Sequence, residues 1–334
     1  MQYIKPHGTD AAFHFSVEDY FMNHAPLTEP LFMIWQADKC AMLGSNQVAQ
    51  AEVDLTYAHE TGITLVRRQS GGGTIFTDMG TLLYTLILPE TEGKSPQEIV
   101  REIFAAPMVR ALNKLGIPAE MAGRNDLLVD GRKFSGLAQY ARKGRVCSHG
   151  SLLVDTDLDM LTRVLQVDPE KILSKAIQSV RSRVTNLSEH MDTPMSALDF
   201  WAMLEDKLKE EWDLQPYELS PSDLATIDTI YRQKFGNPDW TFGKAPPFSL
   251  HNSIRFPGGK LDLFLDVKNG IIRACTICGD FLGTQPTREL EEKLEGVTLQ
   301  YEAVEAALKD LDLTPYLGGI TKEEALTCMF GEGV

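Results

Sequence analysis

The segment Asp126–Gly136, with the sequence DLLVDGRKFSG, restricts the possible folds more than any other part of the chain. Asp130-Gly131 stands between two strand-like runs, and Asp-Gly is a preferred pair for a two-residue type I′ hairpin turn. A second turn of this kind, Lys143-Gly144, leads into a strand-like run over Val146–Val154. Because strands joined by tight hairpins are antiparallel, the sequence predicts a mixed sheet rather than a purely parallel one. With the helical patterns elsewhere in the chain, this gives an α+β fold.

The same hairpin carries two charged groups that could perform chemistry. Period-two alternation puts Lys133 and Ser135 on one face of the returning strand, with Arg132 and Phe134 on the other. Asp126 could hold Mg²⁺ or a base edge, and Lys133 could neutralise charge on a phosphoryl or carboxylate oxygen. A lysine on a strand is, taken alone, more often a solvated side chain.

Further elements follow from local patterns along the chain. Strands are predicted at 31–35, 63–66, 74–77 and 82–88, and helices at 10–24, with Asp10 as N-cap, and at 99–115, with a kink at Pro107. The stretch 237–247, rich in proline and glycine, is typical of a linker. Beyond it, the strands 260–267 and 271–277, joined by Asn269-Gly270, precede helices at 289–294, 301–308 and 322–329. The sequence therefore predicts two domains, 1–244 and 245–334.

Charge and composition limit the classes of partner. The 334 residues carry a net charge of −15, which argues against general nucleic-acid binding, so an anionic ligand needs a local cationic pocket. Candidate cations for such a pocket are Arg67, Arg68, Arg124, Arg132, Lys133, Arg181 and Arg183. No apolar run reaches the ~18–20 residues of a membrane span, and the N-terminus lacks a signal-peptide pattern. Five cysteines, an odd number, favour a reducing compartment, and we expect a cytoplasmic protein.

The segment RRQSGGGTIFTD at 67–78 looks like an anion-binding loop of an unusual kind. A Walker A loop needs Lys-Ser/Thr after its last glycine, whereas Thr74 and Ile75 stand there. A dinucleotide fingerprint would open a helix, whereas a strand-like run follows here. A plain turn between strands remains the alternative for three glycines, but the two arginines in front of them favour anion binding.

Other reactive side chains give weaker signals. His149 is a candidate site residue, although a lone histidine is more often structural. Cys275 and Cys278 form a single C-x₂-C without a second pair, so zinc is not expected there. Cys147, two residues from His149, could form a nucleophile–base pair, but an inert strand cysteine is the commoner case.

Taken together, four segments resemble the lipoate–protein ligase A family: RRQSGGGTIFTD at 67–78, GRNDLLVDGRKFSGLAQ at 123–139, SHGSLLVDTDLDML at 148–161 and SVRSRVTNL at 179–187. DWTFGKAPPFS at 239–249 resembles the family's linker into a small accessory domain. The resemblance implies a biotin/lipoate ligase-like (class II synthetase-like) catalytic domain of mixed sheet and helices at 1–244. It also implies an α+β accessory domain at 245–334. The implied reaction joins lipoate to ATP as lipoyl-AMP, then transfers the lipoyl group to a lysine of an acceptor protein.

The resemblance also implies roles for individual residues. Lys133 would be the catalytic residue, and Asp126 would bind Mg²⁺. Nucleotide contacts would come from Arg68, Gly72, Gly73, Thr74, Ile75, Phe76, Asn125 and Asp126. Lipoate contacts would come from Arg68, Lys133, Ser135, Gly136, Ala138 and His149, with the lipoyl tail partly along 31–35. Acceptors would be the lipoyl domains of 2-oxoacid dehydrogenase E2 subunits and the glycine cleavage H protein, and the enzyme would act as a monomer.

Two positions depart from the family pattern, and two other functions stay open. Ser45 stands where members usually have a basic residue, and Ser148 where many have a second histidine. An octanoyltransferase of the same superfamily would act through a cysteine thioester, for which Cys147 is the candidate. A paralogue that binds lipoate or lipoyl-AMP without catalysis is the other alternative, favoured by Ser45.

Overall fold

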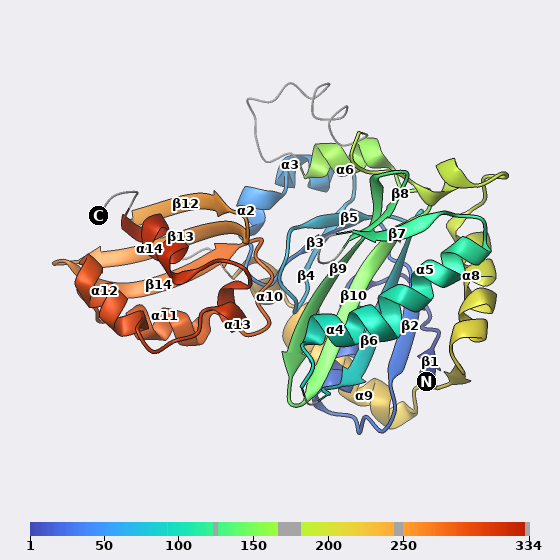
Figure 1. The fold of residues 1–334 in the computed structure, drawn as a ribbon, viewed down its shortest axis with the longest axis horizontal. Coiled ribbons are helices and arrows are strands. Elements are labelled where there is room, and N and C mark those ends of the chain that lie inside the picture. Colours follow the sequence, from blue (N-terminus) through green and yellow to red (C-terminus); the bar gives the residue numbers. More distant parts are fainter. Residues whose placement is uncertain (92, 123–125, 166–181, 244–249, 331–334) are drawn as a thin grey trace. The chain divides into compact units, whose positions relative to one another are not determined.

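The structure, a computed structural model, describes residues 1–91, 93–122, 126–165, 182–243 and 250–330. It divides into two compact units, which are described separately. The first contains residues 1–42, 53–66 and 75–237, and the second contains 43–52, 67–74 and 238–334. Both units combine helices with sheet (Figure 1), so the predicted α+β fold is confirmed. Within the described residues, no helix is both long and apolar enough to span a membrane.

The first unit is built on an eight-stranded sheet of the described residues. The strand order is β11 (Gln215–Pro216), β1 (Gln2–Ile4), β2 (Leu31–Trp35), β6 (Thr81–Pro89), β10 (Arg145–Leu153), β9 (Arg132–Arg142), β8 (Asp126–Val129) and β7 (Ala119–Ala122). β1 pairs in parallel with both of its neighbours, and the remaining pairs are antiparallel. The predicted mixed sheet is therefore confirmed, with the strand predicted at 82–88 near its centre.

Both predicted hairpin turns of this unit have the expected backbone. Asp130 and Gly131 have φ of 50° and 72°, and Lys143 and Gly144 have φ of 52° and 72°. Positive φ at both central residues is the mark of a type I′ turn. The turn residues alone thus predicted correctly that β8 pairs with β9 and that β9 pairs with β10.

The predicted alternation on β9 is wrong, because the strand contains a β-bulge. The pairing shifts between Leu127 and Leu128, which face Ser135 and Lys133 respectively, so Phe134 is an extra residue. An extra residue reverses the alternation beyond it. Lys133 therefore shares a face with Gly136 instead of with Ser135, whose hydroxyl lies 3.2 Å from the buried Tyr84 phenol on the other face.

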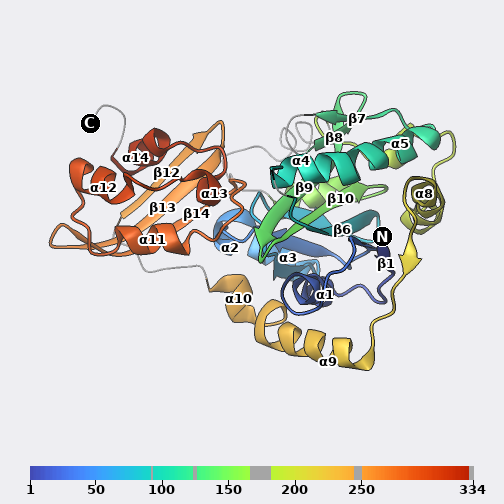
Figure 2. The same ribbon diagram turned by 60° about the horizontal axis from the view of Figure 1, so that its bottom comes forward.

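Helices cover both faces of the large sheet, as Figure 2 shows. One face is covered by α4 (Pro96–Val100), a π-helical turn (Arg101–Ala105), α5 (Ala106–Lys114) and α8 (Ala197–Glu211). The other carries α1 (Ala11–Asn23), against which α9 (Pro221–Ile230) and a second π-helical turn (Tyr231–Phe235) pack. The Asp10 carboxylate accepts hydrogen bonds from the Ala12 and Phe13 amides, which confirms the predicted N-cap.

The helix predicted at 99–115 is divided in an unexpected way. Pro107 lies in the first turn of α5, where its missing N–H costs little, and the irregular turn precedes it. The predicted break is thus present, one turn earlier than expected. α8 and α9 were not predicted at all, and neither were the short strands β1, β7 and β11.

A second, small sheet has the order β4 (Thr64–Arg67), β3 (Cys40–Leu43), β5 (Ile75–Thr77). β4 and β5 were predicted, within one residue, on either side of the glycine loop. Short helices complete the N-terminal part of the chain: α2 (Ala49–Glu52), α3 (Leu55–Glu60), α6 (Leu158–Val164) and a 3₁₀ turn at Leu187–His190.

The C-terminal part of the second unit is an antiparallel sheet of β12 (Leu250–Phe256), β13 (Gly259–Lys268) and β14 (Ile271–Gly279). Against it pack α11 (Arg288–Leu294), α12 (Tyr301–Leu308), α13 (Thr314–Leu317) and α14 (Lys322–Phe330). Asn269 and Gly270, with φ of 55° and 74°, confirm the predicted turn. In the predicted linker, residues 238–242 form the short helix α10 (Pro238–Phe242).

Candidate active site

The Lys133 side chain lies next to Gly136 on the sheet and forms an ion pair with the Asp126 carboxylate. Its Nζ lies 2.7 Å from Asp126 Oδ1, and the two side chains are 40% and 35% exposed. Asp126 and Gly136 are partners in the β8–β9 pair, and a Cβ added to Gly136 would lie 3.0 Å from the lysine Nζ. The bulge at Phe134 makes this possible, since it turns the lysine toward the glycine. The arrangement presents a fixed ammonium group that solvent and a ligand can still reach.

The backbone of Lys133 is fixed from the other edge of β9. Its amide donates to the Arg183 carbonyl at 2.8 Å, and its carbonyl accepts from the Thr185 amide at 2.9 Å. These two bonds form a short parallel bridge between Lys133 and Val184. The described end of SVRSRVTNL therefore pairs with β9 at Val184 and braces the lysine strand. Arg181 lies outside the described residues.

A methyl group at position 136 is expected to displace the lysine. In Gly136→Ala the new Cβ would meet Lys133 Nζ at 3.0 Å and Cε at 3.1 Å, so the ammonium must shift by up to about 1 Å. For the adenylation step that the resemblance implies, we expect the rate to fall about tenfold, with little loss of stability because the lysine end can move. Pyrophosphate exchange in the single variant and in Gly136→Ala/Lys133→Ala checks this. An additive loss in the double variant would contradict the mechanism, because the methyl group would then act elsewhere.

Ala138 and His149 are direct partners in the β9–β10 pair, on the face that also carries Gly136. The His149 Nδ1 lies 2.8 Å from Glu18 Oε2, and both side chains are buried. Glu18, on α1, also accepts from the Tyr140 hydroxyl at 3.3 Å and from the Thr85 hydroxyl at 3.2 Å.

Glu18 and Tyr140 were missed by the sequence reading. The available signal was the pair Glu18-Asp19 between apolar residues in the middle of the helix, since a charged group is rarely buried without a partner.

Arg67 does not belong to the anion-binding candidates. It is almost fully buried, and its guanidinium donates to the carbonyls of Gly44 (2.7 Å), Gln47 (2.6 Å), Trp240 (3.0 Å) and Thr241 (2.6 Å). Burial lowers the pKa of this guanidinium to about 10. These bonds tie two distant loops of the second unit together, so the role of Arg67 is structural.

Arg68 is buried against the glycine loop itself. Its guanidinium donates to the Ser70 hydroxyl at 3.1 Å and to the carbonyls of Gly71 (2.8 Å) and Gly73 (2.7 Å). In this conformation the guanidinium stabilises the loop by hydrogen bonds to its own backbone. To bind Arg68, an anion would have to replace the two carbonyls as hydrogen-bond acceptors.

Two glycines of the loop are required by the structure. A Cβ on Gly71 would lie 2.7 Å from the Phe281 carbonyl oxygen, so close packing excludes a side chain there. Gly72 has φ of 89°, which favours glycine, and its amide donates to the Phe281 carbonyl at 3.2 Å. A Cβ on Gly44 would lie 2.1 Å from the Gly72 carbonyl oxygen, so the neighbouring loop must also be glycine at that position.

The remaining predicted nucleotide contacts are spread over both units. Thr74 donates its hydroxyl to Gln47 Oε1 at 2.7 Å in the second unit. Ile75 and Phe76 lie on β5 in the first unit, where Phe76 is fully buried and pairs with Ala41. The structure thus brings Lys133, Asp126, Gly136, Ala138 and His149 to one face of one sheet, and Arg68, Gly72, Gly73 and Thr74 to one loop. Asn125 and Arg124 lie outside the described residues.

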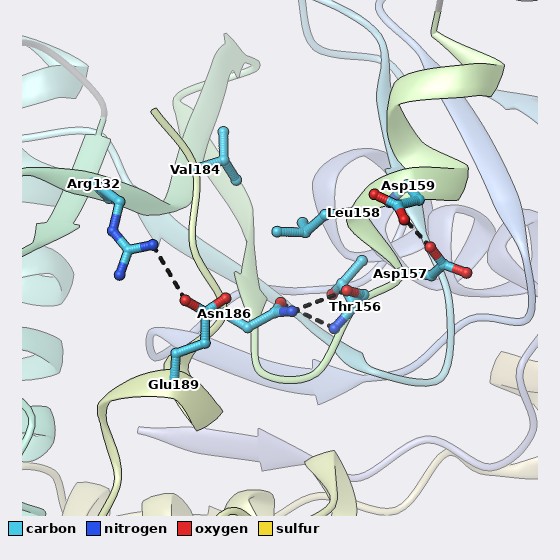
Figure 3. Close-up of a pocket in the computed structure, with 8 residues that line it drawn as sticks. All are labelled: Arg132, Thr156, Asp157, Leu158, Asp159, Val184, Asn186 and Glu189. Atoms are coloured by element: carbon cyan, nitrogen blue, oxygen red, sulfur yellow. Dashed lines mark hydrogen bonds and ion pairs between the residues drawn. The ribbon is translucent and has the colours of Figure 1, made fainter. Parts of the chain in front are cut away.

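A cavity of about 430 Å³ opens at the end of β9 and β10, where Arg132 pairs with Glu189 at 3.2 Å (Figure 3). Its other lining residues are Thr156, Asp157, Leu158, Asp159, Val184 and Asn186. Among the lining residues, Arg132 was a predicted cation of the anion pocket. It is next to Lys133, which forms the bridge with Val184. The Asn186 side-chain amide accepts from the Thr156 N–H at 3.0 Å and donates to the Thr156 carbonyl at 2.9 Å, so these two lining residues are bonded to each other.

Family models match most of the chain. Residues 10–209 match the lipoyl protein ligase A/B catalytic domain, and residues 245–329 match the bacterial lipoate protein ligase C-terminus. The lipoate-protein ligase LplJ of Bacillus subtilis is 36% identical over 324 residues, which is 96% of this chain and 97% of that relative.

Solved structures agree with this assignment. P. falciparum LipL1 in complex with lipoate has a TM-score of 0.74 at 22% identity, covering 93% of this chain and 94% of that one. The bipartite lipoate protein ligase of Thermoplasma acidophilum, described with its E2 lipoyl domain, has a TM-score of 0.66 at 25% identity over 75% and 98% of the two chains. A lipoate-protein ligase A bound with ATP has a TM-score of 0.63 at 24% identity over 72% and 98%. On these matches, the chain belongs to the lipoate–protein ligase family.

Proposed function

We propose that this chain is an ATP-dependent lipoate–protein ligase. It activates lipoate as lipoyl-AMP and then transfers the lipoyl group to a lysine of an acceptor lipoyl domain. The observation that carries the proposal is the Lys133 arrangement, in which one ammonium is held at 2.7 Å from Asp126 over a glycine. Relatives named lipoate-protein ligase and a neighbour bound with ATP support it.

The chemistry needs charge neutralisation more than a protein nucleophile. In the first step a lipoate carboxylate oxygen attacks the α-phosphorus of ATP, and pyrophosphate leaves. In the second step the acceptor ε-amine attacks the lipoyl carbonyl, and AMP leaves. Lys133 lies against the carboxyl and the α-phosphate in both steps, where its charge offsets the negative charge that builds on their oxygens.

Mg²⁺ is the proposed cofactor, and Asp126 is its proposed ligand. The carboxylate has Oδ1 against Lys133, and its side chain is about a third exposed, so Oδ2 can reach a metal. One carboxylate together with phosphate oxygens is a usual environment for Mg²⁺. The ion would neutralise the phosphates when bound.

The arginine–glycine loop is the proposed nucleotide contact. Arg68 would exchange the carbonyls of Gly71 and Gly73 for phosphate oxygens, and Gly72 and Gly73 would allow the backbone to come close. Thr74, Ile75, Phe76 and Asn125 complete the proposed set.

Gly136, Ala138 and His149 line the lipoyl side of the proposed site, with the tail running partly along β2. Ser135 was predicted with them, but its side chain faces Tyr84 on the opposite side of the sheet. A contact from its hydroxyl to a ligand beside Lys133 is therefore not expected.

The proposed acceptors are lipoyl domains of E2 subunits and the glycine cleavage H protein. A neighbouring ligase described with its E2 lipoyl domain supports the first of these. We further propose a monomer in the cytoplasm, with the catalytic domain at 1–244 and the accessory domain at 245–334. The limits of the two matching family models support this division.

Incubation of the full chain with lipoate, ATP, Mg²⁺ and a purified acceptor domain, followed by intact-mass measurement, tests the function. We expect the acceptor to gain the mass of one lipoyl group only when ATP and lipoate are both present. Lipoate-dependent ATP–pyrophosphate exchange isolates the first step. Lipoate binding without any exchange would instead support the non-catalytic paralogue.

Cysteine chemistry distinguishes the ligase from an octanoyltransferase. Cys147 is fully buried, and burial together with the Glu18 charge raises the pKa of its thiol well above the ordinary value. An acyl-accepting thiol needs the opposite shift. We therefore expect Cys147→Ser to ligate lipoate at the wild-type rate. Loss of acyl transfer in that variant, with its fold intact by circular dichroism, would favour the thioester mechanism.

A further inference from the structure

We propose that Glu18, Cys147 and His149 form a binding site for a zinc-type divalent cation, separate from the Mg²⁺ of the adenylation step. One ligand atom from each side chain lies within 4.8 Å of the other two. Cys147 and His149 are two residues apart on β10, so both point from the same face of the sheet toward α1, which carries Glu18.

The donor set suits zinc and disfavours magnesium. A carboxylate, a thiolate and an imidazole are all common zinc ligands, and a three-ligand site leaves a fourth position open. Magnesium takes oxygen ligands in octahedral geometry, which this set cannot provide. In a tetrahedral zinc site neighbouring donor atoms lie about 3.3–3.8 Å apart, so side-chain shifts of about 1 Å would complete the geometry.

The surroundings contain a buried negative charge that needs a cation. The Glu18 side chain is 2% exposed, and within the described residues its ion pairs are with His149 alone. Its other hydrogen-bond partners include Tyr140 and Thr85, which are neutral hydroxyls. A buried carboxylate is stable when it is paired or bound to a metal, and a divalent ion would compensate both it and a thiolate.

The two hydroxyls also act as supports for the ligands. Tyr140 holds Glu18 Oε1 and Thr85 holds Glu18 Oε2, while the Trp35 indole donates to the Thr85 hydroxyl at 3.3 Å. Such outer partners fix the orientation of metal ligands and raise affinity. The Glu18 carboxylate of the proposed site is thus held in place by a second set of residues around it.

Cobalt titration of the intact, chelator-treated chain tests the site without any need for activity. We expect one Co²⁺ per chain, with visible bands of a tetrahedral ion and a near-ultraviolet thiolate-to-cobalt band. Zn²⁺ should displace it, and excess Mg²⁺ should not. Cys147→Ala should lose the thiolate band, whereas Cys40→Ala, which removes another buried thiol of the same unit, should keep it.

Two milder variants guard against misfolding. Glu18→Gln keeps the shape of the side chain and should weaken Co²⁺ binding, and Tyr140→Phe should weaken it about tenfold. A thiolate band that persists in Cys147→Ala, or no cobalt binding by the folded wild type, would overturn the site.

A functional consequence rests on the proposed function. Because His149 lines the proposed lipoyl side, bound zinc should raise the apparent KM for lipoate in the wild type and have no such effect in Cys147→Ala. If cobalt binds as described but no ligation occurs at all, the proposed function fails and the metal site stands. If ligation occurs and bound zinc leaves the KM for lipoate unchanged, the proposal that the metal site and the lipoate site share His149 is wrong.

Discussion

Lys133→Ala is expected to lower lipoate-dependent ATP–pyrophosphate exchange by about 10²–10³-fold, the usual cost of removing one preorganised charge-stabilising donor. The structure gives a reason for a loss of this size. The ammonium is held in place by Asp126 at 2.7 Å, and its strand is braced at both the amide and the carbonyl. A donor that is already oriented needs no rearrangement when charge develops on the substrate.

The matched control for this variant is Lys143→Ala. Lys143 lies in the β9–β10 turn at the other end of the same strand, and its exposed Nζ donates to the Asn23 carbonyl at 3.4 Å. The Lys143→Ala variant should catalyse ATP–pyrophosphate exchange at the wild-type rate. Lys133→Arg should recover little activity, since a planar guanidinium does not fit where an ammonium lies over Gly136. Wild-type exchange in Lys133→Ala would remove the assigned role.

Local turn chemistry explains why so much of the sheet was predictable. Asp130-Gly131, Lys143-Gly144 and Asn269-Gly270 each impose positive φ on two residues, and each pair connects the strands that the sequence predicted. These signals act over four residues, so they do not depend on the rest of the fold. The weak strands β1 and β11 have only a few residues. β1 forms through pairing with β2, and β11 through pairing with β1, and no local sequence pattern records either contact.

The side-chain directions were less predictable than the strands. The bulge at Phe134 decides which residues lie beside Lys133, and Gly136 is its one clue in KFSG. Glycine in a strand often marks a bulge or a close approach. Lys133 and Asp126 were thus found from the sequence, but the prediction that Ser135 shares the face of Lys133 was wrong.

Arg67 and Arg68 show that the role of a charged residue is also hard to predict from the sequence. Adjacent in the sequence, both were candidates for one cationic pocket. Only the folded chain shows that Arg67 donates to five backbone carbonyls, three from residues 44–47 and two from helix α10. Long-range contacts of this kind leave no local trace, so an arginine that stabilises the structure looks like one that binds a ligand.

Asp126→Asn is expected to lower the rate of adenylation by about 10- to 100-fold, in the range of other residues that orient a reactive group. The carboxylate acts in two ways in our proposal: it positions Lys133 through the 2.7 Å ion pair and offers its second oxygen to Mg²⁺. Both functions need the negative charge, which asparagine lacks at the same size. The free energy of unfolding should fall little, because a partly exposed ion pair contributes only about 0–1 kcal/mol.

Two measurements separate the roles of Asp126. If the metal role dominates, raising Mg²⁺ should restore much of the exchange rate of Asp126→Asn. If lysine positioning dominates, Asp126→Asn/Lys133→Ala should be no slower than Lys133→Ala, since residues that act as a unit are not additive. Asp130→Asn is the matched control, because it removes a carboxylate from the same hairpin and places asparagine, which tolerates the positive φ of 50°, in the turn. Wild-type exchange in Asp126→Asn at limiting Mg²⁺ would exclude both roles.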